Sequence, residues 1–185
     1  MQIRYIVLAF YMCLLCVSCV NETNKEITKG IKAFMKKDIK VPSDIMDERD
    51  CAMFRDSTSA RCVYLIKWFE ASECTPCMAS NIANNEALYL DKNKNVEFVY
   101  IINSHQHEVE EIYRGLCSKR VKGTVYLDTC NAFFKANPHI PESELYHTFV
   151  INKQGKVLMV GNPFKNQQMR TLLDKVIARE QKKEK

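Results

Sequence analysis

Apolar and polar residues alternate along the chain in blocks that predict strands and helices. Residues 63–69 are nearly continuously apolar, as expected for a central strand buried on both faces of a sheet. Further strands are predicted at residues 96–102, 123–128, 148–152 and 156–160. Gly155 lies between the last two of these strands, which predicts a hairpin. Residues 39–41 alternate and stop at Pro42, which predicts a short edge strand, and the polar stretch 44–61 predicts a loop.

Helical periodicity fills the segments around these strands. Apolar residues recur every three or four positions before the first strand, after residue 77 and near the C-terminus, which marks one face of an amphipathic helix. Asn103 and Ser104 can cap a further helix, whose early glutamates and late basic residues match the helix dipole. The predicted helices lie at residues 24–38, 78–89, 103–120, 131–137 and 169–177. Strands that alternate with helices and end in a hairpin and a helix predict an α/β domain of three layers.

The most informative motif is Cys74-Thr75-Pro76-Cys77, which follows the first long apolar run and opens a predicted helix. A helix N-terminus offers unpaired backbone N–H groups and about half a positive charge, and both stabilise a thiolate. Cys74 is therefore the expected nucleophile. Cys77 lies within the first turn and is the expected resolving thiol, which attacks a mixed disulfide on Cys74.

Two other interpretations of the motif stay open. A zinc site usually takes four ligands in two closely spaced pairs, whereas the other cysteines beyond residue 20 stand alone and the four histidines are scattered. The second alternative is a disulfide with a purely structural role, although reactive pairs occur where a strand meets a helix start.

The element order and the motif together resemble the thioredoxin fold over residues 39–180. The best-matching segments are residues 69–77 and the hairpin T-F-V-I-N-K-Q-G-K at 148–156, which is similar to the hairpin of TlpA/ResA-type extracytoplasmic oxidoreductases. The resemblance implies a thioredoxin-like three-layer sandwich with a mixed central sheet, an inserted strand and helix at 124–137 and an N-terminal helical extension. It also implies thiol–disulfide exchange through Cys74 and Cys77 without an organic cofactor.

One departure from the family pattern lies beside the motif itself. The family often carries tryptophan at the positions of Glu70 and Glu73. Carboxylates at these places are expected to disfavour a thiolate, raise the pKa of Cys74 and so favour a reductase.

A second departure lies in the loop before the hairpin. Tyr146 stands where the family places a cis-proline, and a trans peptide is expected because a non-proline cis bond costs about 2.5–4 kcal/mol. Tyr146 and Thr148 are expected to form the loop that faces the substrate. The same loop is expected to bring His147 near the dithiol, where imidazole can accept a proton from a cysteine or bind metal with it. The alternative is a hydrogen-bonded histidine that shapes the loop.

The N-terminus predicts export. Arg4 precedes an apolar run from Ile6 to Val17, which is typical of a signal peptide at residues 1–18 and is shorter than the roughly 18 to 20 residues of a membrane-spanning helix. Ser18-Cys19 resembles a bacterial lipoprotein processing site, which implies a lipid on Cys19, a tether and helix at 19–38 and a membrane-anchored periplasmic domain. Cys16 departs from the leucine usual at its position, so ordinary cleavage or an uncleaved anchor stays open.

Composition excludes several other classes of function. The formal net charge of +5 is spread along the chain, and neither an aromatic and basic cluster, a Gly-rich phosphate loop nor an internal repeat is present. No nucleic acid is therefore expected as a partner, and residues 181–185 are expected to form a charged, solvated tail. Trp68 and Cys62 are expected in the core, His105 and His107 on the surface, and a Cys117–Cys130 bridge is left open.

These observations favour a membrane-tethered, extracytoplasmic thiol–disulfide oxidoreductase that acts as a reductase. Its expected partners are a protein disulfide or dithiol client and a membrane or soluble dithiol electron donor. Two alternatives are a thioredoxin-like chaperone for copper or haem assembly, in which Cys74, Cys77 and a nearby histidine bind cuprous copper, and a redox-inert binding module.

Overall fold

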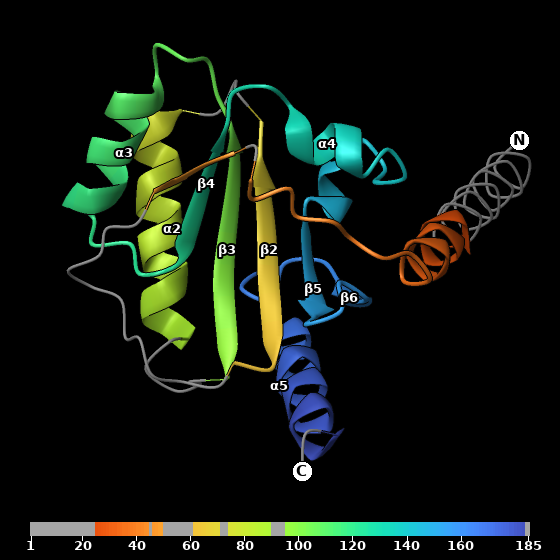
Figure 1. Cartoon of the computed structure of the whole chain (residues 1–185). Coiled ribbons are helices and arrows are strands. Elements are labelled where there is room, and N and C mark those ends of the chain that lie inside the picture. The colour runs from red at the N-terminus through yellow and green to blue at the C-terminus, as the bar shows by residue number, and fades with distance from the viewer. Residues whose placement is uncertain (1–24, 45, 50–60, 71–73, 90–94, 184–185) are drawn as a thin grey trace, which may run out of the picture.

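The computed structural model describes residues 25–44, 46–49, 61–70, 74–89 and 95–183, which contain a mixed six-stranded sheet in the order β1-β4-β3-β2-β5-β6 (Figure 1). β2, β3 and β4 are parallel, β1 is antiparallel to β4, and β5 is antiparallel to both β2 and β6. The strands are β1 Asp47–Arg49, β2 Val63–Phe69, β3 Val96–Asn103, β4 Thr124–Asp128, β5 Thr148–Asn152 and β6 Val157–Val160.

The helices divide between the two faces of the sheet. The parallel strands advance in one direction through two successive crossovers, and because such crossovers are right-handed, α2 and α3 lie on the same face, side by side in Figure 1. Residues 25–34 form a helix that lies beyond β5 and β6. The other helices are α2 Thr75–Tyr89, α3 Val109–Ser118, α4 Ala132–Ala136, the short 3-10 helix η2 Glu144–Tyr146 and α5 Gln167–Lys183.

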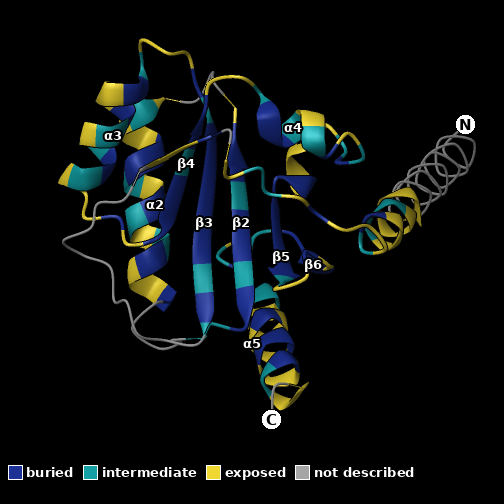
Figure 2. Ribbon diagram, in the orientation of Figure 1, coloured by how far each residue is buried: buried dark blue, intermediate teal, exposed yellow. Residues whose placement is uncertain are grey.

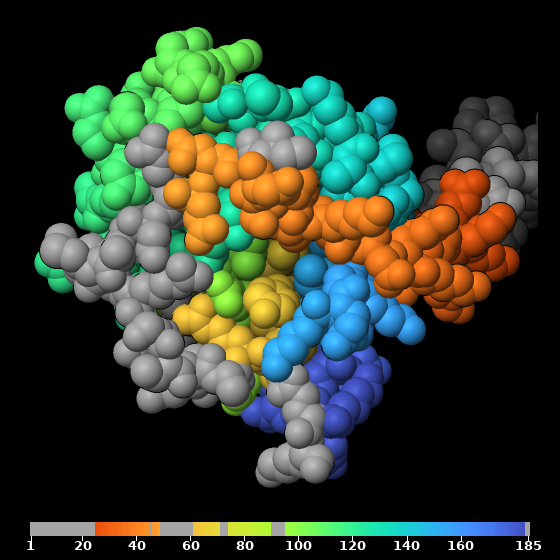
Figure 3. All heavy atoms as spheres, in the orientation of Figure 1, coloured from red at the N-terminus to blue at the C-terminus, as the bar shows by residue number. Residues whose placement is uncertain are grey.

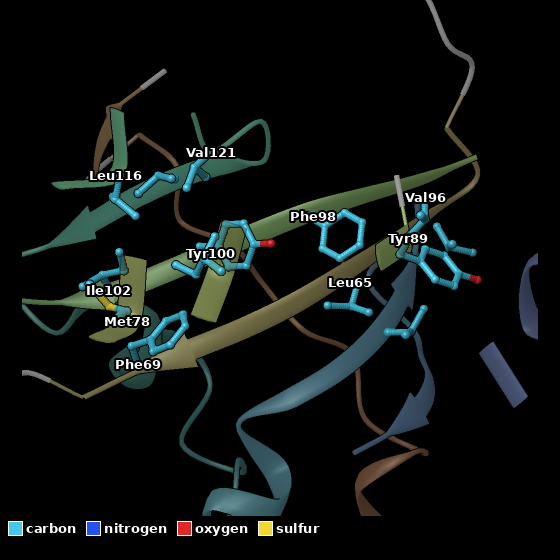
Figure 4. Packing of buried hydrophobic residues seen from close by; sticks show 14 of the residues in the cluster. Leu65, Phe69, Met78, Tyr89, Val96, Phe98, Tyr100, Ile102, Leu116 and Val121 are labelled. Carbon is cyan, nitrogen blue, oxygen red and sulfur yellow. The ribbon is translucent and has the colours of Figure 1, made fainter. Parts of the chain in front are cut away.

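Two apolar clusters cover the two faces of the sheet, because successive strand residues point to opposite sides. Leu65, Phe69 and Phe98 belong to the cluster under α2, α3 and α5, part of which is shown in Figure 4. Ile66 and Ile101 belong to the cluster on the other face, under the N-terminal segment and α4. The central strands are therefore buried on both sides, as the apolar run at 63–69 predicts for β2 (Figure 2).

The N-terminal segment crosses the sheet from one edge to the other. Asp38 forms an isolated bridge with Lys156 beside the β5–β6 hairpin, and β1 then pairs with β4 at the opposite edge. Figure 3 shows this segment in orange, running over the face of the molecule. The prediction of a strand at 39–41 is wrong: the Ile39 N–H donates to the Gly155 carbonyl, and the Lys40 N–H donates to the Asn137 side chain.

Two further details correct the sequence interpretation. The polar stretch predicted to be a loop contains β1, and α3 begins after Glu108 without a side-chain cap. Ser104, expected as a cap, is buried, and its N–H donates to the Asp128 carbonyl. At the C-terminus, α5 continues to Lys183 and includes the first residues of the predicted tail.

Candidate redox site

The C-x-x-C motif lies between the end of β2 and the first turn of α2, at the carboxyl edge of the parallel strands. The Cys74 carbonyl accepts a hydrogen bond from the Met78 N–H at 2.9 Å, so Cys74 is the residue that caps the helix. Cys77 follows in the first turn. Both side chains are exposed, and both are free thiols. This geometry presents the Cys74 sulfur to solvent at a helix N-terminus, where a partner protein can reach it.

The two thiols are electrostatically unequal. The Cys77 thiol and the Cys77 backbone N–H donate hydrogen bonds to the Cys74 sulfur, and these bonds lower the pKa of Cys74 below its ordinary value. The same side-chain contact, together with the charge on Cys74, raises the pKa of Cys77. The arrangement suits Cys74 as the attacking thiolate and Cys77 as the thiol that keeps its proton.

The expected rise in the pKa of Cys74 is therefore wrong in direction. Hydrogen bonds made in contact with the sulfur stabilise its thiolate, whereas the field of an exposed carboxylate is screened by water and salt. Glu70 is exposed, and Glu73 lies outside the described residues.

The last residues of the loop before β5, Tyr146 and His147, are buried, and the N-terminal helix packs on Tyr146. Tyr146 ends η2, its N–H donates to the Ser143 carbonyl at 2.9 Å, and its ring meets the Phe34 ring edge-on at 5.7 Å. Gly30 lies directly over the Tyr146 hydroxyl, where a larger residue has no room. The expected trans peptide at Tyr146 is confirmed, since no cis bond occurs in the described part of the chain. Thr148 begins β5 and is buried.

His147 lies against the core. His147 is 6% exposed. Its ring lies edge-on to the Trp68 ring, with ring centroids 4.4 Å apart and an interplanar angle of 65°. The backbone N–H of Trp68 donates to the His147 carbonyl at 2.8 Å. Trp68 is buried, as predicted, and stacks on Phe134 at 5.7 Å. The His147 Nε2 is buried and has no hydrogen-bond partner among the described residues. The contacts found for His147 are thus with Trp68 rather than with either thiol.

The chain is similar to several solved structures over part of its length. An uncharacterized thioredoxin-like protein from Porphyromonas gingivalis aligns with a TM-score of 0.45 and 17% identity, over 64% of this chain and 75% of that one. The thioredoxin domain of a thiol-disulfide oxidoreductase from Bacteroides vulgatus aligns with a TM-score of 0.43 and 10% identity, over 63% of this chain and 79% of that domain. A bacterioferritin comigratory protein from Xanthomonas campestris aligns with a TM-score of 0.46 and 17% identity, over 65% of this chain and 82% of that one. The order of the helices and strands, with the C-x-x-C motif after the central strand β2, is thioredoxin-like.

These similarities concern the fold alone. No protein-family model matches the sequence, and no curated protein matches it. Within the described residues no helix is both long and apolar enough to cross a membrane. The predicted signal peptide and Cys19 lie outside the described residues.

The structure excludes Cys130 as the disulfide partner of Cys117. Cys117 is disulfide-bonded while Cys130 is a free, exposed thiol, so a bridge between them is wrong. Cys117 lies in the last turn of α3, before β4 in the chain, whereas Cys130 follows the far end of that strand, which is about 16 Å long at 3.3 Å per residue. A disulfide requires Cα atoms within about 7 Å. Cys62 is buried, as predicted, and its thiol donates to the Asn95 carbonyl at 3.4 Å.

The histidines next to α3 are on the surface, as predicted. His105 and His107 are exposed, and their rings stack with centroids 5.6 Å apart. In the parts of the chain that the structure describes, no three histidine, cysteine or acidic side chains gather as a metal site would require.

Sequence reasoning missed a groove that borders the motif. It runs between α2 and α3 and begins at Thr75 and Pro76, the two residues between the cysteines. The one signal for it in the sequence is Gly115, a glycine in the interior of an amphipathic helix, which removes a side chain from the helix contact.

Proposed function

We propose that the protein is an extracytoplasmic thiol–disulfide oxidoreductase that exchanges disulfides with protein clients through Cys74 and Cys77. The observation that carries the proposal is the exposed pair at the start of α2, in which Cys77 donates two hydrogen bonds to the Cys74 sulfur. A stabilised thiolate at an accessible position is the group that disulfide exchange requires.

The proposed reaction proceeds in two exchanges. The Cys74 thiolate attacks one sulfur of the client disulfide and forms a mixed disulfide, while the other client sulfur leaves as a thiolate and takes up a proton. Cys77 then loses its proton and attacks the Cys74 sulfur, which releases the second client thiolate. The client gains two electrons and the protein acquires a Cys74–Cys77 disulfide, which an external dithiol reduces again.

Replacement of each cysteine tests the proposal. We expect Cys74→Ala to abolish exchange with a protein disulfide, because the attacking sulfur is lost. We expect Cys77→Ala to accumulate a mixed disulfide between Cys74 and the client, because the resolving thiol is lost, and non-reducing electrophoresis with mass spectrometry detects that species. Full exchange activity in the Cys74→Ala protein rules the proposal out.

The proposed direction is reduction of the client. Its support in the sequence is the pair of carboxylates at Glu70 and Glu73 beside the motif, while the lowered pKa of Cys74 acts in the opposite sense because it stabilises the dithiol state. A glutathione redox titration measures the midpoint potential of the Cys74–Cys77 pair and decides whether the protein is a reductase or an oxidant. A midpoint potential near that of thioredoxin, about −270 mV, supports a reductase, and one near about −120 mV makes the protein an oxidant.

His147 has a proposed role as proton acceptor at the dithiol. Its buried, unpartnered Nε2 supports this role, and its contact with Trp68 supports a role in packing. Replacement by alanine separates the two. A fall in exchange rate near neutral pH that exceeds the loss of folded protein supports proton transfer, and an unchanged rate per folded molecule assigns His147 to packing.

We also propose that a lipid on Cys19 anchors the domain to a membrane. The support is the sequence Ser18-Cys19 at the end of the apolar N-terminal run. Stable anchoring normally needs more than one acyl chain, which a fully modified N-terminal cysteine provides. Mass spectrometry of the mature N-terminus tests this, and a Cys19→Ser protein that stays in the membrane fraction contradicts it.

A further inference from the structure

The first turn of α2 and the facing side of α3 enclose a groove of about 480 Å³. Thr75, Pro76 and Ala79 line it from α2, and Arg114, Gly115 and Lys119 line it from α3. Figure 1 shows the two helices side by side on one face of the sheet. The volume lies within the range of sites that hold a bound ligand or a few side chains of a partner.

Small residues keep this groove open. Gly115 faces Thr75 across the helix contact, where a Cβ added at the glycine comes within 3.6 Å of the Thr75 methyl group. Ala79 follows one turn along α2 with only a methyl group. The floor is therefore apolar and shallow, with room for the side chains of an extended polypeptide.

The groove begins at the first turn of α2, which Cys74 caps and in which Cys77 lies. Thr75 and Pro76, which line it, stand between Cys74 and Cys77 in the chain, and both cysteine side chains are exposed. Because an extended chain advances about 3.3–3.6 Å per residue, a polypeptide seated here brings a cysteine only a few residues away to Cys74.

The walls of the groove carry excess positive charge. Arg114 and Lys119 are exposed cations, Glu111 is the one carboxylate among the lining residues, and the first turn of α2 contains no acidic residue. Neither cation forms an ion pair within the part of the chain that the structure describes, although the Arg114 Nε donates to the Glu110 carbonyl. Guanidinium and ammonium groups at the edge of an apolar groove complement carboxylates of a partner.

We propose that this groove is the client-docking site and that it selects polypeptide segments with carboxylate side chains near the cysteine to be exchanged. The inference rests on the proposed exchange function of Cys74 and Cys77. In the docked complex the Cys74 thiolate forms a disulfide with the client cysteine, and the client's other sulfur leaves as the thiolate.

Matched peptide disulfides test the docking site. Three substrates are compared: a peptide disulfide flanked by glutamates, the same peptide with lysines in their place, and a small neutral disulfide. We expect the acidic peptide to react about tenfold faster than the basic one, a preference that high salt reduces. We expect Lys119→Glu and Arg114→Glu each to remove most of this preference and to leave the small disulfide within about twofold, since it does not need the groove.

Two further variants serve as controls. Lys175→Glu makes the same change of charge at an exposed position on α5 and is expected to leave all three rates unchanged. Ser118→Trp fills the groove from its α3 side and is expected to slow both peptides while sparing the small disulfide. Circular dichroism and thermal unfolding confirm that each variant is folded, and the substituted residues are exposed.

The outcomes separate the docking inference from the exchange function. Equal rates for acidic and basic peptides, or a preference that survives both charge reversals, overturn the docking inference even if the small disulfide is still reduced. Failure of the unmodified protein to reduce the small disulfide, or activity in Cys74→Ala, overturns the exchange function itself.

Discussion

At the scale of single residues, Asn137 shows how one buried polar side chain fixes a long segment. It is fully buried, its Oδ1 accepts the Lys40 N–H at 2.8 Å, and its Nδ2 donates to the Lys40 and Phe133 carbonyls at 2.7 and 2.8 Å. The side chain thereby satisfies its own polar atoms and ties the N-terminal segment to the end of α4. A buried amide with all of these bonds stabilises the fold, whereas one without them destabilises it.

Replacement of Asn137 by alanine is expected to lower the free energy of unfolding by about 2–3 kcal/mol, because the N–H and carbonyl groups of Lys40 lose the buried side chain that bonds them. Asn85→Ala is the matched control, since its hydrogen bond to Asn81 is exposed, and we expect a change within about 0.5 kcal/mol. Urea denaturation measures both. Equal losses of unfolding free energy in the two variants contradict a stabilising role for the buried hydrogen bonds of Asn137.

Glu86 is a buried carboxyl group that ties α2 to the turn before β4. Its two oxygens accept the Lys122 and Gly123 N–H groups, both at 2.7 Å. Burial raises the pKa of Glu86 above its ordinary value, and the two backbone hydrogen bonds act against that rise. The native state therefore holds the Glu86 proton more tightly than the unfolded chain does.

This shift predicts a pH dependence of stability with a definite sign. The contribution of Glu86 is fully present below the unfolded pKa of about 4.3 and is lost as pH rises through the raised folded pKa. Glu86→Gln removes this titration. We expect the free energy of unfolding of the unmodified protein to fall relative to that of the variant between pH 4 and pH 8. Parallel curves for the two proteins across this range are inconsistent with a raised pKa.

At the scale of elements, two glycines near α2, Gly115 and Gly123, lie in different surroundings. A Cβ at Gly123 comes within 2.6 Å of the Tyr100 ring, 2.8 Å of the Phe98 carbonyl and 2.9 Å of the Glu86 carboxylate. A Cβ at Gly115 meets only the Thr75 methyl at an ordinary 3.6 Å. The turn into β4 therefore requires glycine for space, whereas α3 does not.

Alanine at these two positions is expected to have opposite effects. Gly123→Ala is expected to destabilise the protein by about 1–3 kcal/mol, since rigid backbone and a core ring must move. Gly115→Ala is expected to stabilise it by about 0.5–1 kcal/mol, because alanine is the better helix former. Thermal unfolding of both variants checks the pair, and a destabilised Gly115→Ala protein conflicts with the open contact described for α3.

Elements were predictable where local pattern and tertiary structure agree. The predicted strands at 63–69 and 148–152 match β2 and β5 without error, because strands buried on both faces need continuous apolar sequence. β1 contains Asp47, Glu48 and Arg49 and has no such pattern, so only its pairing with β4 makes it a strand. Residues 39–41 alternate like a strand but bond to Gly155 and Asn137 instead.

At the scale of the whole molecule, the sequence predicts the fold class and locates the motif, while long-range contacts determine the surroundings of the motif. The position of Cys74 at a helix start follows from local pattern. The pKa of Cys74 does not, because it depends on hydrogen bonds from Cys77. Likewise, no local pattern shows that Phe34 packs on Tyr146, or that His147 meets Trp68.

The central claim is that Cys74 attacks and Cys77 resolves, and alkylation of the reduced protein measures this most directly. Iodoacetamide is added over a range of pH, and mass spectrometry measures the rate of alkylation of each cysteine. The rate reports the thiolate fraction, since only the thiolate reacts. We predict that Cys74 reacts at lower pH than an ordinary cysteine, whose pKa is about 8.5, and that Cys77 reacts only at higher pH. Equal profiles for the two cysteines, or earlier reaction at Cys77, contradict the account.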